Sequence, residues 1–210
     1  MSRKAVLYFD FISPFAYLFF KQLHKLPAHL EITLKPLLFA GLLKHWGHKG
    51  PAEISAKRKF TYRFITWQAT ELGIPLKFPP AHPFNPVKLL RLAVALGSSH
   101  ASVETIFDFV WREGGDMTNA TALSRLGKTL GVEDIDSLVG NPTVKSQLIQ
   151  NGEEALAQGV FGVPTLVVDG ELFWGSDSIT MLQRYLEKPG FFDNAEMRRV
   201  SDLPEGAVRS

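Results

Sequence analysis

Residues 5–26, AVLYFDFISPFAYLFFKQLHKL, decide the fold because they join a strand pattern to a helix start. The apolar run at 5–11 is typical of a buried strand. Ser13 is a preferred N-cap residue, and Pro14 loses no hydrogen bond at the first helical position. The sequence therefore predicts a strand, a tight turn and a helix that continues to Leu26.

Further along the chain, residues 30–38 (LEITLKPLL) alternate in the manner of a second strand, and Pro27 separates this strand from the helix. A strand, a helix and a second strand in this order form a unit whose two strands run parallel. Pro36 favours an edge position for the second strand, because proline cannot donate to a neighbouring strand.

Helical patterns replace strand patterns between residues 41 and 158. The expected helices are 53–72, 85–97, 102–113, 121–130 and 141–158. Phe60, Phe64 and Trp67 lie near helical spacing on the first of them, and this stripe of rings is expected to pack in the core. The adjacent run at 57–59 (KRK) is expected to be a solvated helix face.

Strand patterns return at 164–168 and 171–174, separated by Asp169-Gly170, which is typical of a β-hairpin turn. A last helix is expected at 178–187, and the polar remainder is expected to be loosely held. We therefore predict an α/β fold in three parts. Residues 1–40 and 159–190 form the sheet-containing domain, 41–158 form a helical insertion, and 191–210 form a C-terminal tail.

The 210-residue chain contains no cysteine, which excludes disulfide exchange and thiolate metal sites by its own residues. His45 and His48 lack a third ligand, so no metal site is expected. With 23 basic and 21 acidic residues, the net charge of +2 provides no general field for nucleic acid or an anionic membrane. No signal region or membrane span is evident, and a cytoplasmic location is expected.

Two separated segments suggest a single site. In the first, Ser13 stands at a helix N-terminus, where free amides and the helix dipole favour an anion. In the second, residues 161–165 (FGVPT) place a proline directly before a strand. A cis Val163-Pro164 bond there would leave the N–H and C=O of Val163 free to pair with an extended peptide.

Together with residues 160–177 (VFGVPTLVVDGELFWGSD) and 73–76 (GIPL), these segments resemble the DsbA-like branch of the thioredoxin superfamily. Within that branch they resemble the 2-hydroxychromene-2-carboxylate isomerases and the kappa-class glutathione transferases. The resemblance spans nearly the whole chain and implies a thioredoxin-like fold with a large α-helical insertion. Thiol-disulfide relatives carry C-x-x-C where residues 13–16 read SPFA here, in agreement with the absence of cysteine.

The resemblance implies glutathione as a bound cofactor. Its thiol would face Ser13, its cysteinyl backbone would pair with Val163 before Pro164, and its γ-glutamyl end would meet Trp174-Gly175-Ser176-Asp177. The Ser13 hydroxyl would be the catalytic group, because a hydroxyl donor and a helix N-terminus both favour a thiolate over a thiol. Asp177 can pair with the γ-glutamyl ammonium group.

The expected substrate is a small aromatic or conjugated carbonyl compound. The residues expected to contact it are Phe15, Lys44, His48 and His82, with Trp46 and Phe84 available to line the same pocket. Lys44 corresponds to the family's lysine displaced by one residue, and His82 stands near the position of the family's tyrosine. The family's Asn-Arg pair is replaced by the sequence GPAEI at 50–54, which leaves the hydroxychromene substrate itself open.

Three functions remain open at this point. The leading hypothesis is an isomerase in which the glutathione thiolate adds to a conjugated double bond and is later released. The second is a kappa-type transferase, in which the thiolate stays attached to an electrophile. The third is a non-catalytic module that binds glutathione or an extended peptide along Val163. The resemblance also allows a homodimer.

Overall fold

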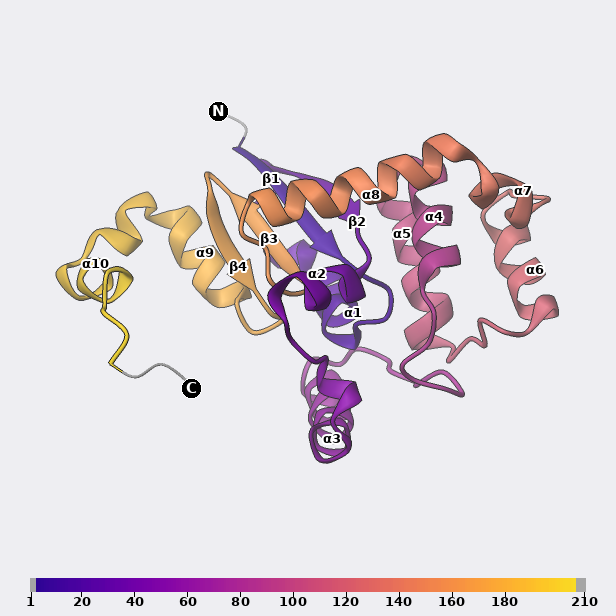
Figure 1. The fold of residues 1–210 in the computed structure, drawn as a ribbon, viewed down its shortest axis with the longest axis horizontal. Helices are drawn as coiled ribbons and strands as arrows, with labels where there is room; N and C mark the ends of the chain where they lie inside the picture. The colour runs from indigo at the N-terminus through magenta and orange to yellow at the C-terminus, as the bar shows by residue number, and fades with distance from the viewer. Residues whose placement is uncertain (1–2, 207–210) are drawn as a thin grey trace.

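A four-stranded sheet with helices on both faces forms the centre of the computed structural model, which describes residues 3–206 (Figure 1). The strand order is β2-β1-β3-β4. β1 (Arg3–Phe9) pairs in parallel with β2 (Leu30–Pro36) and antiparallel with β3 (Thr165–Val168), which pairs antiparallel with β4 (Glu171–Trp174). The predicted parallel pair, the edge position of β2 and the β3–β4 hairpin are confirmed.

The α-helices and the shorter helical turns have the following bounds: α1 Pro14–Lys21, η1 Leu23–Lys25, α2 Phe39–Trp46, η2 Pro51–Glu53, α3 Ser55–Glu71, α4 Val87–Ala95, α5 His100–Phe107, the π-helical turn η3 Asp108–Arg112, α6 Ala120–Thr129, α7 Ile135–Gly140, α8 Pro142–Ala157, α9 Ile179–Glu187, η4 Pro189–Asp193 and α10 Ala195–Ser201. Helices α2 and α7 were not predicted as separate elements.

Successive side chains of a strand point to opposite faces of the sheet, so the strands contribute to two apolar layers, one on each face. On one face, Leu7 and Phe9 of β1 join the larger core with residues of α1, α4, α5 and α9. On the other face, Tyr8 packs with Leu42 of α2 and Ala155 of α8. Figure 1 shows α8 lying across the sheet. The last helix of the expected insertion therefore covers one face of the sheet.

Helix α1 begins where the sequence predicts and ends earlier. Ser13 is the N-cap, and its Oγ accepts a hydrogen bond from the Ala16 N–H at 3.2 Å. The helix ends at Lys21 rather than Leu26, because the Gln22 N–H turns back to the Phe19 carbonyl and a 3-10 turn follows. The tighter turn brings the chain to Pro27 and into β2.

The aromatic stripe of α3 is not in the core. Phe60 is 68% exposed and Trp67 is 55% exposed, whereas the buried residues of α3 are Ile65 and Ala69. Ile65 lies one residue beyond Phe64, which rotates it about 100° around the helix, and that face contacts the body of the protein. The prediction of a core position for Phe60 and Trp67 was therefore wrong.

The C-terminal segment is held more firmly than its polar composition suggested. Phe191 and Phe192 pack against the larger core, and the ring of Phe192 stacks on Tyr185 at a centroid distance of 5.4 Å. Helix α10 follows this anchor. The described part of the expected tail is therefore helical at 191–193 and 195–201, and residues 207–210 lie outside the described residues.

Candidate active site

Ser13 lies at the junction of α1 and the segment that precedes β3. Its hydroxyl donates to the Val163 carbonyl at 3.4 Å while its Oγ caps α1. The Val163-Pro164 bond is cis, as expected. Within residues 3–206 no protein acceptor is paired with the Val163 N–H. A hydroxyl, a helix N-terminus and an unpaired backbone donor thus lie next to one another.

The buried side chain of Asp10 stabilises the backbone next to this junction. Its carboxylate is fully buried and accepts hydrogen bonds from the Ile12 N–H at 3.0 Å and the Phe39 N–H at 2.8 Å. Burial raises the pKa of Asp10 to about 7, against the opposing effect of these two donors. Asp10 therefore links the turn before α1 to the first residue of α2.

His82 and Tyr62 form a pair beside the same turn. His82 Nε2 donates to the Ile12 carbonyl at 2.8 Å, so in the neutral ring Nδ1 is an acceptor. The Tyr62 hydroxyl, which has one proton to donate, lies 2.6 Å from Nδ1 and 2.8 Å from the His82 carbonyl. Burial lowers the pKa of His82, Arg58 adds to this shift, and the bond to Ile12 opposes it. Because both ring nitrogens have partners, His82 positions the turn before Ser13. Tyr62 was not singled out from the sequence.

Trp111 holds the residue before Ile12. Its Nε1 donates to the Phe11 carbonyl at 2.8 Å, and the side chain is fully buried. The edge of the His82 ring also approaches Trp111, with ring centroids 5.5 Å apart. Two carbonyls in succession, those of Phe11 and Ile12, are therefore bonded by side chains that lie 70 residues or more away in the sequence.

A cavity of about 430 Å³ opens next to Ser13. Its expected lining residues are Ser13, Phe15, His48, His82, Val163 and Trp174, and its other lining residues include Phe39, Lys49, Glu53, Tyr62 and Phe161. The walls combine apolar rings with a lysine, a carboxylate and a hydroxyl, which is typical of a small-molecule site. Sequence reasoning missed Lys49, although it stands directly after His48.

Several expected residues lie outside this cavity. Lys44 is exposed on α2, and Trp46 donates from Nε1 to the Val160 carbonyl at 3.1 Å. Ser176 and Asp177 line a separate cavity of about 310 Å³ with Gln68, to which the Ser176 hydroxyl donates at 3.2 Å. The substrate and γ-glutamyl assignments therefore fall on two neighbouring cavities, and Lys44 belongs to neither.

Gly175, between Trp174 and Ser176, allows the chain to turn into this second cavity. Its φ is +90°, and an added Cβ would lie 2.5 Å from Asp177 Oδ1. Only glycine fits both the backbone conformation and the close approach of the carboxylate.

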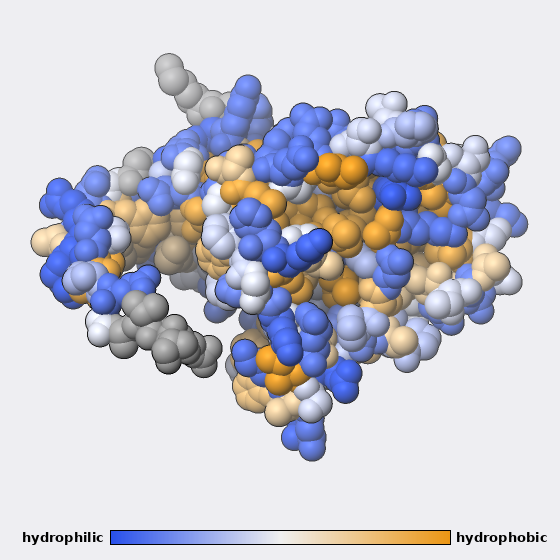
Figure 2. Space-filling model, viewed as in Figure 1, coloured by the Kyte–Doolittle hydropathy of each residue, from blue (hydrophilic) through white to orange (hydrophobic). Residues whose placement is uncertain are grey.

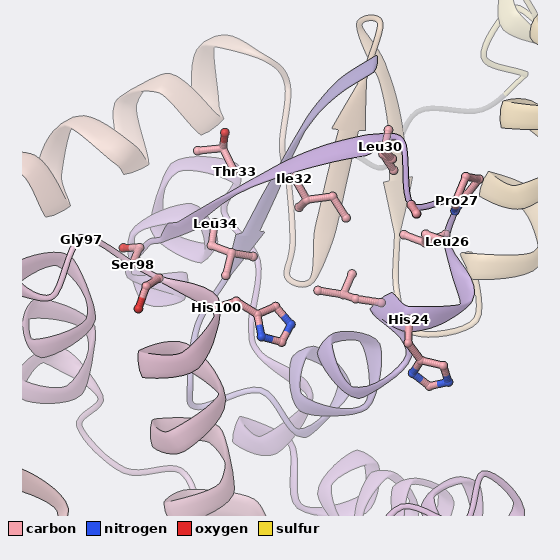
Figure 3. Close-up of a pocket in the computed structure, with 13 residues that line it drawn as sticks. His24, Leu26, Pro27, Leu30, Ile32, Thr33, Leu34, Gly97, Ser98 and His100 are labelled. Carbon is pink, nitrogen blue, oxygen red and sulfur yellow. The ribbon is translucent and has the colours of Figure 1, made fainter. Parts of the chain in front are cut away.

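A third, larger cavity of about 640 Å³ lies along β2 and away from Ser13 (Figure 3). Ile32, Leu34 and His100 surround it in Figure 3, and some of its polar groups, among them Ser99 and His24, have partners in the protein. Ser99 Oγ caps α5 by accepting from Ser102, and His24 Nδ1 bonds with the Lys21 carbonyl. The cavity beside Ser13 is the better candidate for a reaction site than this larger cavity, because the Val163 N–H on its wall has no acceptor among the described residues.

Neither a metal centre nor a membrane span is found in the described part of the chain. No group of three or more His, Cys, Asp or Glu residues within residues 3–206 could hold a metal ion. Over the same residues, no helix is both long and apolar enough to cross a bilayer.

The sheet order, the capped first helix and the cis-proline segment beside it define a thioredoxin-like protein with added helices. In particular, the family model of the DSBA-like thioredoxin domain matches residues 5–187, and the chain belongs to this family.

Relatives within this family carry two kinds of name. The chain is 26% identical to "Glutathione s-transferase kappa 2" of Caenorhabditis elegans, over 90% of this chain and 94% of the relative. It is 29% identical to "2-hydroxychromene-2-carboxylate isomerase" of Pseudomonas putida, over 84% of this chain and 90% of that relative. A solved structure of a 2-hydroxychromene-2-carboxylate isomerase superposes with a TM-score of 0.76 at 24% identity, covering 96% of this chain and 100% of that structure. The last likeness concerns the fold.

Proposed function

We propose that the chain is a glutathione-dependent isomerase of the 2-hydroxychromene-2-carboxylate isomerase type, acting on a conjugated aromatic carbonyl compound. The observation that carries this proposal is the Ser13 hydroxyl, at a helix N-terminus beside Val163, opening into a cavity of about 430 Å³ in a chain without cysteine. The enzymes named among its relatives support the same class.

The residues around the cavity fit glutathione. The unpaired Val163 N–H could donate to an extended peptide backbone, and Ser13 could donate to a sulfur anion. The acidic side chain of Asp177, in the neighbouring cavity, suits an ammonium group. When bound, glutathione would supply a thiolate that adds to the conjugated double bond, allows rotation about the resulting single bond and leaves as that bond reforms.

The chain's own residues would favour the anion and exclude water. The N-terminus of α1 carries about half a positive charge, and the Ser13 hydroxyl can turn from the Val163 carbonyl to a sulfur. Phe15, Phe39 and Phe161 form apolar walls of the cavity. Lys49 on the same wall provides a cation for a negatively charged oxygen of the substrate.

A kappa-type transferase is the second candidate, and Glu53 favours it. Where the isomerases carry an Asn-Arg pair, this chain places the Glu53 carboxylate at the cavity wall, where it accepts from the Gly50 N–H at 2.5 Å. A carboxylate in this position suits a neutral electrophile better than an anionic substrate. Product analysis separates the two activities, because an isomerase returns its glutathione and a transferase consumes one equivalent.

The first experiment measures the thiol pKa of bound glutathione from thiolate absorbance as the pH is varied. We expect the wild type to lower this pKa by about one to two units, and Ser13→Ala to recover part of the shift. Ser99→Ala removes the same hydroxyl from the N-cap of α5 and is the matched control. Saturable binding with an unshifted thiol pKa would instead identify a non-catalytic binding module.

A further inference from the structure

A further cavity, of about 330 Å³, lies in the helical part of the chain and shares no lining residue with the cavity beside Ser13. Residues of α4, α6 and α7 form its wall, together with Asn85 and Met117 from the connecting loops. Figure 1 shows these three helices grouped at the end of the molecule opposite α10. The cavity is therefore separate from the site around Ser13.

The wall of this cavity is mainly apolar. Leu89 and Val139 are buried, and Val87, Met117 and Leu123 are half-buried. Figure 2 shows hydrophobic residues reaching the surface over α4, among hydrophilic ones. Ligand pockets begin at about 300 Å³, so this space suits a small molecule that has an apolar body.

Arg91 of α4 brings an uncompensated positive charge to this wall. Its Nε is buried and has no hydrogen-bond partner. None of the ion pairs among the described residues includes Arg91. Lys88, one turn earlier on the same side of α4, pairs with Asp136 of α7. A buried donor without an acceptor costs free energy, and no acidic residue lines the cavity to supply one.

The start of α4 adds to the positive potential of this wall. Its first turn contains no acidic residue, and its N-cap, Pro86, makes no side-chain hydrogen bond. A helix N-terminus carries about half a positive charge and stabilises an anion. A single negative charge in the cavity would therefore balance both Arg91 and the helix, and would leave the pair of Lys88 with Asp136 intact.

We propose that this cavity binds a small organic carboxylate, whose two oxygens accept hydrogen bonds from the Arg91 guanidinium while its apolar body packs against Leu123 and Val139. A carboxylate matches the planar fork of a guanidinium and takes two parallel hydrogen bonds from it. The apolar wall favours an acid with a hydrocarbon body over a bare inorganic anion. This site is independent of the function proposed for Ser13.

Calorimetric titration of the full chain with benzoate tests the site. We expect saturable binding with a Kd of about 1 mM or less, and binding at least about tenfold weaker for benzamide, which has the same ring and no charge. Arg91→Met keeps an unbranched apolar side chain on α4 and should weaken benzoate binding by about ten- to a hundredfold. Arg125→Met is the matched control, because it removes an equal charge from the exposed surface of α6 and should bind as the wild type does. Circular dichroism establishes that each variant is folded.

The Arg91 side chain provides a second readout, which a change in folding would not reproduce. Because its Nε–H is buried without an acceptor, its ¹H–¹⁵N resonance should shift as benzoate is added, with the Kd that calorimetry gives. Asn85 of this cavity and His82 of the cavity beside Ser13 lie on one loop, so shifts of backbone amides would not separate the two sites. The side-chain signal of Arg91 reports on its own cavity.

Lys49→Met distinguishes the two cavities, since Lys49 lines the one beside Ser13. Loss of benzoate binding in this variant, with unchanged affinity in Arg91→Met, would place the carboxylate beside Ser13 and overturn the proposal. Absence of saturable binding at about 10 mM benzoate would overturn it as well. Inorganic phosphate that binds as tightly as benzoate and depends on Arg91 would refute the assignment to an acid with an apolar body.

Discussion

Replacing Asp10 by asparagine should remove a specific dependence of stability on pH. In the folded protein Asp10 is fully buried, and its pKa is raised from 3.8 to about 7. Between these two values the folded state keeps a proton that the unfolded chain has lost. Since stability falls with rising pH wherever the folded state binds more protons, the wild type should lose stability between pH 4 and pH 7.

The size of this effect follows from the shift. Each pKa unit corresponds to about 1.4 kcal/mol, so a shift of about three units gives up to about 4 kcal/mol across the window. Asparagine retains one oxygen for the two backbone donors, Ile12 N–H and Phe39 N–H. The loss of one acceptor should cost about 1–3 kcal/mol at every pH. Asp10→Asn should therefore be less stable than the wild type at pH 4, and the difference should shrink or reverse by pH 8.

Urea unfolding followed by tryptophan fluorescence, at half-unit steps from pH 4 to pH 8, measures this difference directly. The matched control is Asp116→Asn. Hydrogen bonds from Thr118 lower the pKa of this exposed carboxyl, so its contribution changes only below about pH 4. If the stability difference between the wild type and Asp10→Asn stays constant from pH 5 to pH 7, Asp10 is ionised in the fold and the reasoning fails.

Three other substitutions test the site. Asp177→Ala should weaken glutathione binding by about 1–3 kcal/mol in calorimetry, and equal affinity would remove Asp177 from the binding site. Trp111→Phe leaves the buried Phe11 carbonyl without its donor. The free energy of unfolding, measured in urea titrations, should fall by about 2–4 kcal/mol. A smaller loss would mean that a water molecule replaces the indole N–H as the donor. Tyr62→Phe removes the partner of His82 Nδ1 and should cost about 0.5–1.5 kcal/mol, whereas unchanged stability would show that the pair contributes nothing.

The parts of the fold that could be predicted are those set by neighbouring residues. Ser13-Pro14 specified the start of α1, because capping and a fixed φ act within one turn. Asp169 and Gly170 specified the β3–β4 turn, where both have positive φ. The end of α1 was less predictable, since Gln22 terminates the helix through a backbone bond that leaves no mark in the sequence.

The parts that could not be predicted depend on distant residues. Nothing near Tyr62 indicates that its hydroxyl meets His82, which reaches Ile12 across 70 residues. The exposure of Phe60 could not be read from its spacing either, because a stripe of rings on a helix has the same spacing whether it is buried in the core or exposed. Local patterns specify an element and leave open what lies against it.

The added helices have a role in the site that the order of elements alone does not reveal. The turn between β1 and α1 exposes two successive carbonyls, those of Phe11 and Ile12, to the protein interior. Buried carbonyls need donors, and the strands and α1 supply none here. Trp111 and His82, both from the expected insertion, fill that requirement. Because Ser13 directly follows these residues, the position of its hydroxyl depends on the helical turn that carries Trp111 and on the loop that carries His82.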